Sequence, residues 1–430
     1  MIIRDPANPD KFLSYEPPKP AHQSTDRPHR HSGAKSIKPQ LEIADIFRQY
    51  GPEYRDKHKL SLAQHAVVNA IVNCRTDALG GHLHKCRDCD HETPEYNSCR
   101  NRHCPKCQWP AAAKWIAARK KELLPAPYFH VVFTLPSQLR LPARYNQRVI
   151  YGLLFKAASE TLLTLGRDPK HIGGDIGLIA VLHTWGQNMI DHPHVHCIVP
   201  GGALSTNGKK WLWPKKSKRR KKFFVHVNVI SVLFKKKFMH YLRQANQKGQ
   251  LKFTGQIEHL GQSDVFQTLV NTLYRLDWVT YCKRPFGGPE QVLNYLGRYT
   301  HRVAISNSRL IKVENGRVYF KWKNSKKDGR LEESSLKIDE FIRRFLLHVL
   351  PDGLMKIRHY GFLSNRHKKV KLAQCRTILG NVKLDPDAET LDDAEDHQQP
   401  APRVCPKCGS SRMICLGEFK PDRERTRRPP

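Results

Sequence analysis

The apolar residues between positions 41 and 74 recur with the period of an amphipathic helix. Two runs are visible: Leu41, Ile43, Ile46 and Phe47, then Leu62, Val67, Val68 and Ile71. The second run follows Ser61, whose hydroxyl can cap a helix N-terminus. Residues 111–124 are strong helix formers and stop at Pro125, which predicts a further helix. The segments 41–74 and 111–124 are therefore expected to be mainly helical.

From Tyr128 onward the pattern changes to short apolar strands with helical stretches between them. The expected strands are 129–135, 177–189 and 194–199, and the expected helix is 149–165. The segment Ile190-Asp191-His192-Pro193 suits a tight connection, so the second and third strands are expected to form a hairpin. Another hairpin is predicted over 310–322, around Asn315-Gly316. The predicted fold class is α+β, with an antiparallel sheet backed by helices.

The length of 430 residues exceeds that of one hydrophobic core, so several domains are expected. The expected division is a flexible basic arm (1–40), a helical zinc-binding domain (41–125), a catalytic domain (126–380) with a basic loop (209–222), an acidic linker (381–404) and a basic tail with a CxxC pair (405–430).

The net charge of the chain indicates the kind of partner that it binds. The chain carries 74 Lys and Arg against 39 Asp and Glu, a formal net charge of +35, which predicts binding to nucleic acid. The first residues lack the apolar region of a signal peptide, and no run has the roughly 18 apolar residues of a spanning helix. No membrane partner is expected, and the chain is expected to be intracellular.

Paired cysteines predict a structural zinc site. Cys86-x2-Cys89 and Cys104-x2-Cys107 are separated by 14 residues, a spacing close to that of paired CxxC zinc sites. Cys99 and His103 could replace one of these four or start a second site. Buried cysteines without a metal fit the polar surroundings poorly.

A weaker metal half-site lies near the C-terminus. Cys405-x2-Cys408 and the later Cys415 supply three thiolates, and His397 is a speculative fourth ligand. A site without metal is an equally good interpretation.

The segment His194-Val195-His196 continues into an apolar strand. Residues two apart on a strand share a face, so both imidazoles can bind one divalent cation. A third ligand is expected from the neighbouring strand, on which His183, Trp185 and Gln187 share a face. Gln187 is favoured because we expect it almost opposite His194 across the turn, with His183 as the second choice and His192 as the third. The alternative is a polar, histidine-rich sheet face without metal.

Tyr295 and Tyr299 lie at helical spacing, so one helix face is expected to carry both phenols. Taken alone, such a stripe is more often core packing. A phenol is a weak nucleophile unless its proton is removed or a metal makes its target more electrophilic. A phosphodiester is that target, and Arg298 and Arg302 could hold the flanking DNA backbone.

Several segments resemble one known family. They are Phe133-Thr134-Leu135, 183–187, 192–202, 285–289, 295–307 and the cysteine block that ends at Cys107. In this order they resemble the two-tyrosine HUH transposases of rolling-circle insertion sequences, of the insertion sequence 91 type, with their N-terminal zinc domain. The resemblance extends from about residue 45 to about residue 415.

The resemblance implies a mechanism and a fold. One tyrosine would cleave a transposon end and keep a 5′-phosphotyrosine, and the second would take the target strand. Tyr295 and Tyr299 match that pair, His194 and His196 match the metal histidines, and Gln187 fits a polar third ligand. The core would be an RRM-like HUH fold that acts on single-stranded or hairpin-forming ends with Mg²⁺ or Mn²⁺, while Zn²⁺ would be structural.

Some basic residues do not match the family pattern. Lys215, Lys216, Arg219 and Arg220 belong to a basic loop that could grip DNA or be an insertion without that role.

Two other functions stay open at this point. A plasmid or phage replication initiator or relaxase would use the same chemistry. A non-enzymatic, zinc-dependent DNA-binding regulator would use the histidines and tyrosines only structurally. The oligomeric state and the recognised DNA sequence are not predicted.

Overall fold

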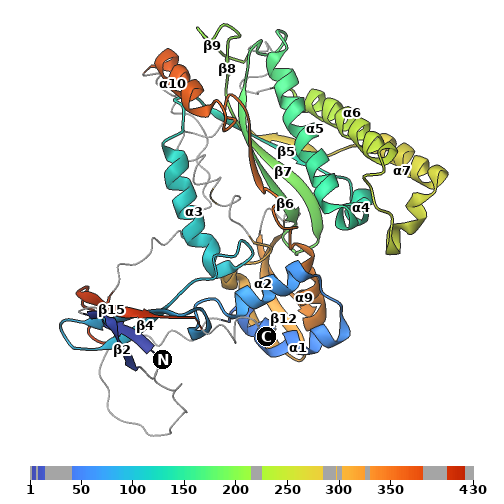
Figure 1. Cartoon of the computed structure of the whole chain (residues 1–430). Coiled ribbons are helices and arrows are strands. Elements are labelled where there is room, and N and C mark those ends of the chain that lie inside the picture. Colours follow the sequence, from blue (N-terminus) through green and yellow to red (C-terminus); the bar gives the residue numbers. More distant parts are fainter. Residues whose placement is uncertain are drawn as a thin grey trace. The chain divides into compact units, whose positions relative to one another are not determined.

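A computed structural model describes residues 41–214, 225–283, 297, 303–324, 330–380 and 404–421, and the backbone of 2–5 and 8–14. The chain divides into two compact units. Unit 1 comprises Met1–Gln108, Ile305–Arg343 and Asp393–Pro430, and unit 2 comprises Trp109–Ala304 and Arg344–Asp392. Both units combine helices with antiparallel strands, which confirms the predicted α+β class (Figure 1).

The first part of unit 1 contains the two predicted N-terminal helices, α1 (Ile43–Lys57) and α2 (Leu62–Val72). Ser61 caps α2 as predicted, because its hydroxyl accepts from the Gln64 backbone N–H while the Gln64 side chain accepts from the Ser61 N–H. Most residues of the apolar runs pack inward, with Phe47 and Ile71 1 % exposed, whereas Leu62 at the start of α2 is exposed. The helical prediction for this region is confirmed.

A three-stranded sheet in unit 1 comes from the later part of the chain. Its strands are β11 (Leu310–Glu314), β12 (Arg317–Asn324) and β13 (Arg330–Lys337), followed by α9 (Ile338–Leu347). The predicted turn at Asn315-Gly316 joins β11 to β12, and both residues have positive φ, as a tight hairpin turn requires. The Asn307 side chain accepts from the backbone N–H of Ile43, which connects this region to the start of α1.

The second sheet of unit 1 has the order β2-β1-β15-β3-β4. Its strands are β1 (Ile2–Asp5), β2 (Asn8–Ser14), β3 (Gly81–Cys86), β4 (Glu92–Tyr96) and β15 (Met413–Phe419). Segments expected to be a flexible arm and a tail thus contribute strands: β15 pairs with the edge of the β3-β4 hairpin, and β1 pairs with β15. The two units therefore differ from the contiguous domains expected from the sequence.

The main sheet of unit 2 has the order β10-β5-β7-β6-β14, with every neighbouring pair antiparallel. The strands are β5 (Tyr128–Thr134), β6 (Gly177–Trp185), β7 (Asp191–Pro200), β10 (Thr280–Lys283) and β14 (Ile357–Gly361). The three predicted strands are confirmed and lie at the centre. The turn between β6 and β7 starts earlier than expected, since Asp191 already pairs with Trp185.

Helices cover one face of this sheet. They are α4 (Arg140–Tyr145), α5 (Gln147–Arg167), α6 (Val227–Gln247) and α7 (Ser263–Arg275) (Figure 1). The core between helices and sheet takes alternate strand residues, such as Phe133, Val195 and Leu182. The intervening positions point to the opposite face, which we call the histidine face because it carries His183, His194 and His196.

A further group of elements in unit 2 lies outside the main sheet and the helices that cover it. Its elements are α3 (Pro105–Lys120), which begins in unit 1, β8 (Ala203–Leu204), β9 (Trp211–Leu212) and α10 (Lys368–Leu379). The helix expected over 111–124 is α3, which starts earlier and ends at Lys120. Trp115, Ile116 and Leu123 pack against Tyr128 and Ile198, so α3 and the chain after it cover part of the histidine face.

One described helix, α5, is long and apolar enough to cross a membrane by length and composition. Its packing is that of a core helix, because Leu154, Phe155 and Leu162 are fully buried against the sheet and α6.

Candidate functional site

Three buried imidazoles meet on the histidine face. His194 and His196 extend from β7, and His183 on β6 lies directly opposite His194. Their ligand nitrogens all lie within 4.8 Å of one another, and their exposed fractions are 8 %, 6 % and 3 % in that order. Among the described histidines, these are the three that the structure gathers into a group able to bind a metal.

Hydrogen bonding fixes the tautomer of His194. Its Nδ1 lies 2.5 Å from the His192 carbonyl oxygen, which can only accept, so Nδ1 carries the proton and donates. Burial lowers the pKa of His194 to about 4, and the ring is therefore neutral at pH 7. In a neutral ring with a protonated Nδ1, Nε2 has the lone pair that binds a metal.

His196 is oriented by another histidine. Its Nδ1 lies 2.8 Å from Nε2 of His130, and the two rings stack with centroids 5.0 Å apart. Metal binding through Nε2 of His196 would require a proton on Nδ1, which would then be donated to His130. Sequence analysis missed His130, although it lies on the predicted strand 129–135 at a position of the same face as His196.

A polar network holds the turn between β6 and β7. The guanidinium of Arg144 donates to the Asp191 carboxylate with Nη2 at 2.5 Å. His348 Nε2–H donates to the Met189 carbonyl at 3.0 Å, and the Thr184 hydroxyl lies 3.2 Å from Nδ1 of His348. Burial lowers the pKa of His348, so this network contains a neutral imidazole. It fixes the hairpin that carries the three imidazoles.

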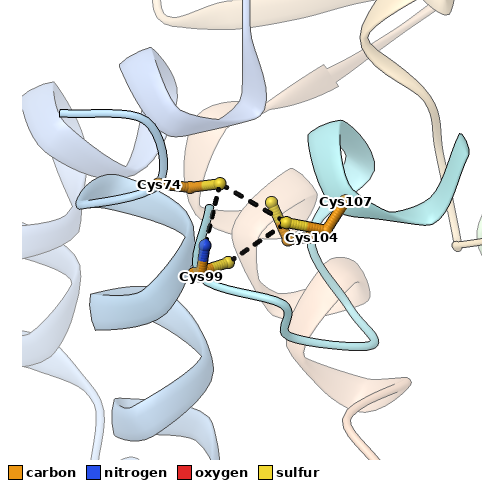
Figure 2. A group of neighbouring side chains, drawn as sticks. All are labelled: Cys74, Cys99, Cys104 and Cys107. Atoms are coloured by element: carbon orange, nitrogen blue, oxygen red, sulfur yellow. Dashed lines mark hydrogen bonds between the residues drawn. The ribbon is translucent and has the colours of Figure 1, made fainter. Parts of the chain in front are cut away.

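A first cysteine cluster lies in unit 1 (Figure 2). Its members are Cys74, Cys99, Cys104 and Cys107, and all four Sγ atoms lie within 4.8 Å of one another. Cys107 Sγ lies 3.5 Å from Cys74 Sγ and 3.6 Å from Cys99 Sγ. A Zn–S distance of about 2.3 Å puts two sulfurs of a tetrahedral site about 3.8 Å apart, so the spacing fits zinc.

The same cluster stabilises a thiolate, which is the form that binds zinc. A hydrogen bond from the Cys104 thiol lowers the pKa of Cys107, and the same bond raises the pKa of Cys104. Cys74 comes directly after α2, and Cys104 immediately precedes α3, so the cluster joins the ends of two helices.

A second cysteine cluster, also in unit 1, contains Cys86, Cys89, Cys405 and Cys408. The expected zinc quartet of Cys86, Cys89, Cys104 and Cys107 is therefore wrong: each CxxC pair joins a different cluster. The reason is the pairing of β15 with β3, which brings the C-terminal cysteines to Cys86. Cys99 is a member of the first cluster, whereas His103 and Cys415 belong to neither. His397 lies outside the described residues.

Comparison with known proteins shows the family. A family model described as "Putative transposase" matches residues 177–371, and one described as "Transposase zinc-binding domain" matches residues 46–135. A protein of Sinorhizobium fredii named as a putative transposase is 48% identical over 384 residues, which cover 88% of this chain and 95% of that protein. The chain belongs to the insertion sequence 91-like transposase family.

A more distant relative supports the same family. The transposase for insertion sequence element IS801 of Pseudomonas savastanoi pv. phaseolicola is 27% identical over 305 residues, which cover 70% of each chain. No solved structure matches significantly. The chain is thus a transposase of a bacterial insertion element with an N-terminal zinc-binding domain.

The third imidazole of this transposase differs from the expected ligand. Gln187 lies in the turn after β6, which Gly186 N–H closes by donating to the Ile190 carbonyl at 3.0 Å. The expected pairing of Gln187 almost opposite His194 is wrong, because the register puts His183 there. The early start of β7 causes this shift.

The predicted nucleophiles and all six residues predicted to contact DNA lie outside the described residues. They are Tyr295, Tyr299, Arg298, Arg302, Lys215, Lys216, Arg219 and Arg220. Gly297, which lies between the two tyrosines in the sequence, is described, and a Cβ atom there would overlap the Ile116 side chain. Gly297 therefore packs against α3, at the hydrophobic cluster on the histidine face.

Proposed function

We propose that this transposase cuts one DNA strand by tyrosine attack at a metal ion held by His183, His194 and His196, and then joins the cut strand to another. The observation that carries the proposal is the arrangement of three buried imidazoles on one sheet face. A neutral His194 with its proton bonded away from the cluster is suited to a cation and poorly suited to binding a phosphate directly.

The donor set favours Mn²⁺ over Mg²⁺. Mg²⁺ prefers oxygen ligands, whereas imidazole nitrogens suit transition metals. The ion would supply charge neutralisation at the non-bridging oxygens of the scissile phosphate. The chain's own contribution is to hold three rings in place: the His192 carbonyl orients His194, and His130 orients His196.

Tyr295 and Tyr299 are the proposed nucleophiles. The phenol oxygen would attack phosphorus and displace the 3′ oxygen, which leaves a 5′-phosphotyrosine and a 3′-hydroxyl. A 3′-hydroxyl would later attack the phosphotyrosine and restore the phenol, so joining needs no external energy source. The packing of Gly297 against Ile116 supports this proposal, because Ile116 also packs on Ile198 of the histidine face.

The proposed substrate is single-stranded or hairpin-forming DNA at the ends of the element. The formal charge of +35 supports a polyanionic substrate. Arg298 and Arg302 flank the proposed nucleophiles in the sequence, and the basic loop 209–222 is a second candidate contact. We propose residues 126–380 as the nuclease region and residues 41–125 as the region that recognises the ends.

The first cysteine cluster would hold the structural zinc of the recognition region. Four sulfurs from Cys74, Cys99, Cys104 and Cys107 complete a tetrahedral set without water. Such a closed site supports folding and leaves no coordination position for catalysis.

A covalent-adduct assay tests the nuclease proposal. Purified protein is incubated with labelled single-stranded oligonucleotides from the element ends and Mn²⁺, and adducts are separated on a denaturing gel. Tyr295→Phe and Tyr299→Phe are each expected to impair strand joining, and the double variant is expected to form no adduct. Tyr274→Phe is a matched control, because Tyr274 is an exposed tyrosine on α7. Adducts formed by the double variant would show that another residue is the nucleophile.

A further inference from the structure

We propose that the second cysteine cluster, Cys86, Cys89, Cys405 and Cys408, holds a second zinc ion that fastens the C-terminal strand to the N-terminal zinc region. Two of these ligands, Cys405 and Cys408, lie beyond the residues matched by either family model, 46–135 and 177–371. The site would make residues near the C-terminus a structural part of the zinc-binding region.

The sulfur geometry fits a tetrahedral ion. Cys86 Sγ lies 3.6 Å from Cys408 Sγ, and Cys89 Sγ lies 3.5 Å from Cys405 Sγ. All four ligand atoms lie within 4.8 Å of one another. A disulfide requires sulfurs about 2.05 Å apart, and none of the twelve cysteines of the chain forms one. The spacing is instead close to the about 3.8 Å expected between two sulfurs bound to one zinc.

The two halves of the site have the same backbone structure. In the first half, Cys86 N–H donates to the His91 carbonyl and Asp90 N–H donates to the Cys86 carbonyl. The second half repeats both bonds at the same spacing: Cys405 N–H donates to the Ser410 carbonyl, and Gly409 N–H donates to the Cys405 carbonyl.

The residue after each CxxC pair also matches. Asp90 and Gly409 both have positive φ, of 54° and 74°. This conformation is uncommon for a residue other than glycine, and it recurs here at the same place in both loops. Two segments more than three hundred residues apart therefore form equivalent loops that direct paired thiols at a common point.

Contacts beside the cluster hold the two loops together. Met413 on β15 pairs with Cys86 on β3, so the two CxxC loops leave the same end of a strand pair. The Arg412 guanidinium donates to the Asp88 carboxylate, with Nε at 3.1 Å. The Arg87 N–H donates to the Arg412 carbonyl at 2.9 Å.

The surroundings do not explain the cluster as ordinary core packing. Cys408 is exposed and Cys89 is half-buried, and charged residues such as Asp88 and Lys407 adjoin them in the sequence. Among the side chains that the structure describes, the hydrophobic cluster beside β15 has two buried members, Leu83 and Phe419. These side chains bury little apolar surface and so contribute little to the free energy of folding. A structural zinc commonly supplies folding free energy in such small units.

Alkylation of the native protein tests the site directly. Zinc-loaded full-length chain is treated with iodoacetamide, and mass spectrometry measures the modified fraction at each cysteine. Cys405 and Cys408 are expected to be protected as strongly as Cys104, whereas the exposed Cys415 in the adjacent strand reacts. Reaction of Cys408 at the rate of Cys415 would overturn the proposal.

Zinc counting in variants gives a second test. In a His194→Ala background, which removes the imidazole site, the chain is expected to bind two zinc ions. The double variant Cys405→Ser/Cys408→Ser is expected to bind one, and Cys86 and Cys89 are expected to become reactive while Cys74 and Cys104 stay protected. Cys415→Ser is the matched control and should keep both ions. Two ions in the double variant, or a single ion in a parent chain whose Cys405 and Cys408 stay reactive, would refute the second site.

The results of the alkylation and zinc-counting tests do not depend on whether the chain is a nuclease. Zinc content and cysteine protection do not depend on DNA cleavage, and an inactive chain could still have both ions.

Discussion

The histidine centre and the two cysteine clusters are built on different kinds of support. The imidazoles sit on the middle strands of a five-stranded sheet whose other face is covered by helices and a continuous hydrophobic core. The second cysteine cluster sits at the end of a sheet in which the described side chains form a hydrophobic cluster with two buried members, Leu83 and Phe419. The folded sheet and its core keep the imidazoles in position. In unit 1, by contrast, zinc bound by the cysteines is expected to stabilise the surrounding fold.

This difference follows from what each site needs. A catalytic metal must exchange ligands with a substrate, so its protein ligands should keep their positions without it. A structural zinc has all its coordination positions filled by protein, and its binding energy becomes folding energy. Removing metal should therefore have opposite consequences in the two regions.

The largest expected effect is that of zinc removal. Binding of a structural zinc contributes about 10 kcal/mol or more to folding, so a strong chelator should unfold the zinc-bound part of unit 1. Hydrogen exchange measured by mass spectrometry should show lost protection in β3 and β15. Protection in β5 and β7 should remain. Equal loss of protection in both regions would show that the fold around the imidazoles depends on metal as much as the fold around the cysteines does.

His194→Ala tests whether the histidine centre binds the catalytic metal. Loss of one of three imidazoles should reduce DNA cleavage by more than about 100-fold, beyond the effect of losing a residue that only orients a ligand. DNA binding and the zinc bound at the two cysteine clusters should stay unchanged. Cleavage of labelled oligonucleotides at saturating Mn²⁺ is the measurement, and His240→Ala, an exposed histidine on α6, is the control. Unchanged cleavage in the His194 variant would refute the metal assignment.

The same contrast explains what the sequence could predict. His194 and His196 are two residues apart on one strand, so their common face follows from strand geometry alone. The central strands and the Asn315-Gly316 turn were likewise predictable from local patterns. The third imidazole was not, because the choice between His183 and Gln187 depends on a register that only the observed turn fixes.

The cysteine clusters were less predictable, since their members come from distant segments. Local spacing suggested that Cys86, Cys89, Cys104 and Cys107 form one quartet. The actual partners depend on the pairing of β15 with β3, which has no local signal in the sequence. Cys74 was overlooked for the same reason, because it stands alone after α2 without a neighbouring cysteine.

His130 offers a smaller and sharper test of the histidine centre. His130→Ala removes the partner of His196 Nδ1 and should weaken Mn²⁺ binding by about 10-fold to 100-fold. His130→Gln keeps an acceptor in the side chain and should restore part of the affinity. The Mn²⁺ concentration that gives half-maximal cleavage reports this effect. If His130→Ala changed the melting temperature but left the Mn²⁺ concentration for half-maximal cleavage unchanged, His130 would be shown to contribute to packing only.

The smallest expected effect concerns pH and the scaffold of unit 2. Burial lowers the pKa of His359 on β14 to about 4, and the neighbouring cations Lys368 and Arg119 act in the same direction. Arg119 Nη1 lies 3.5 Å from His359 Nε2, a contact that suits a neutral imidazole as acceptor. The ordinary pKa of histidine, which applies to the unfolded chain, is about 6.5.

The sign of the pH effect follows from these two values. Between pH 6.5 and pH 4 the unfolded chain binds a proton at His359 that the folded chain does not, so the free energy of unfolding falls as the pH falls. Partial exposure limits the contribution to about 1 kcal/mol at pH 5. Urea unfolding without Mn²⁺ at pH 7.5 and pH 5.0 should therefore show a smaller loss for His359→Gln than for the parent chain. The exposed His367→Gln should behave like the parent, and an identical loss in all three would show that His359 does not titrate in this window.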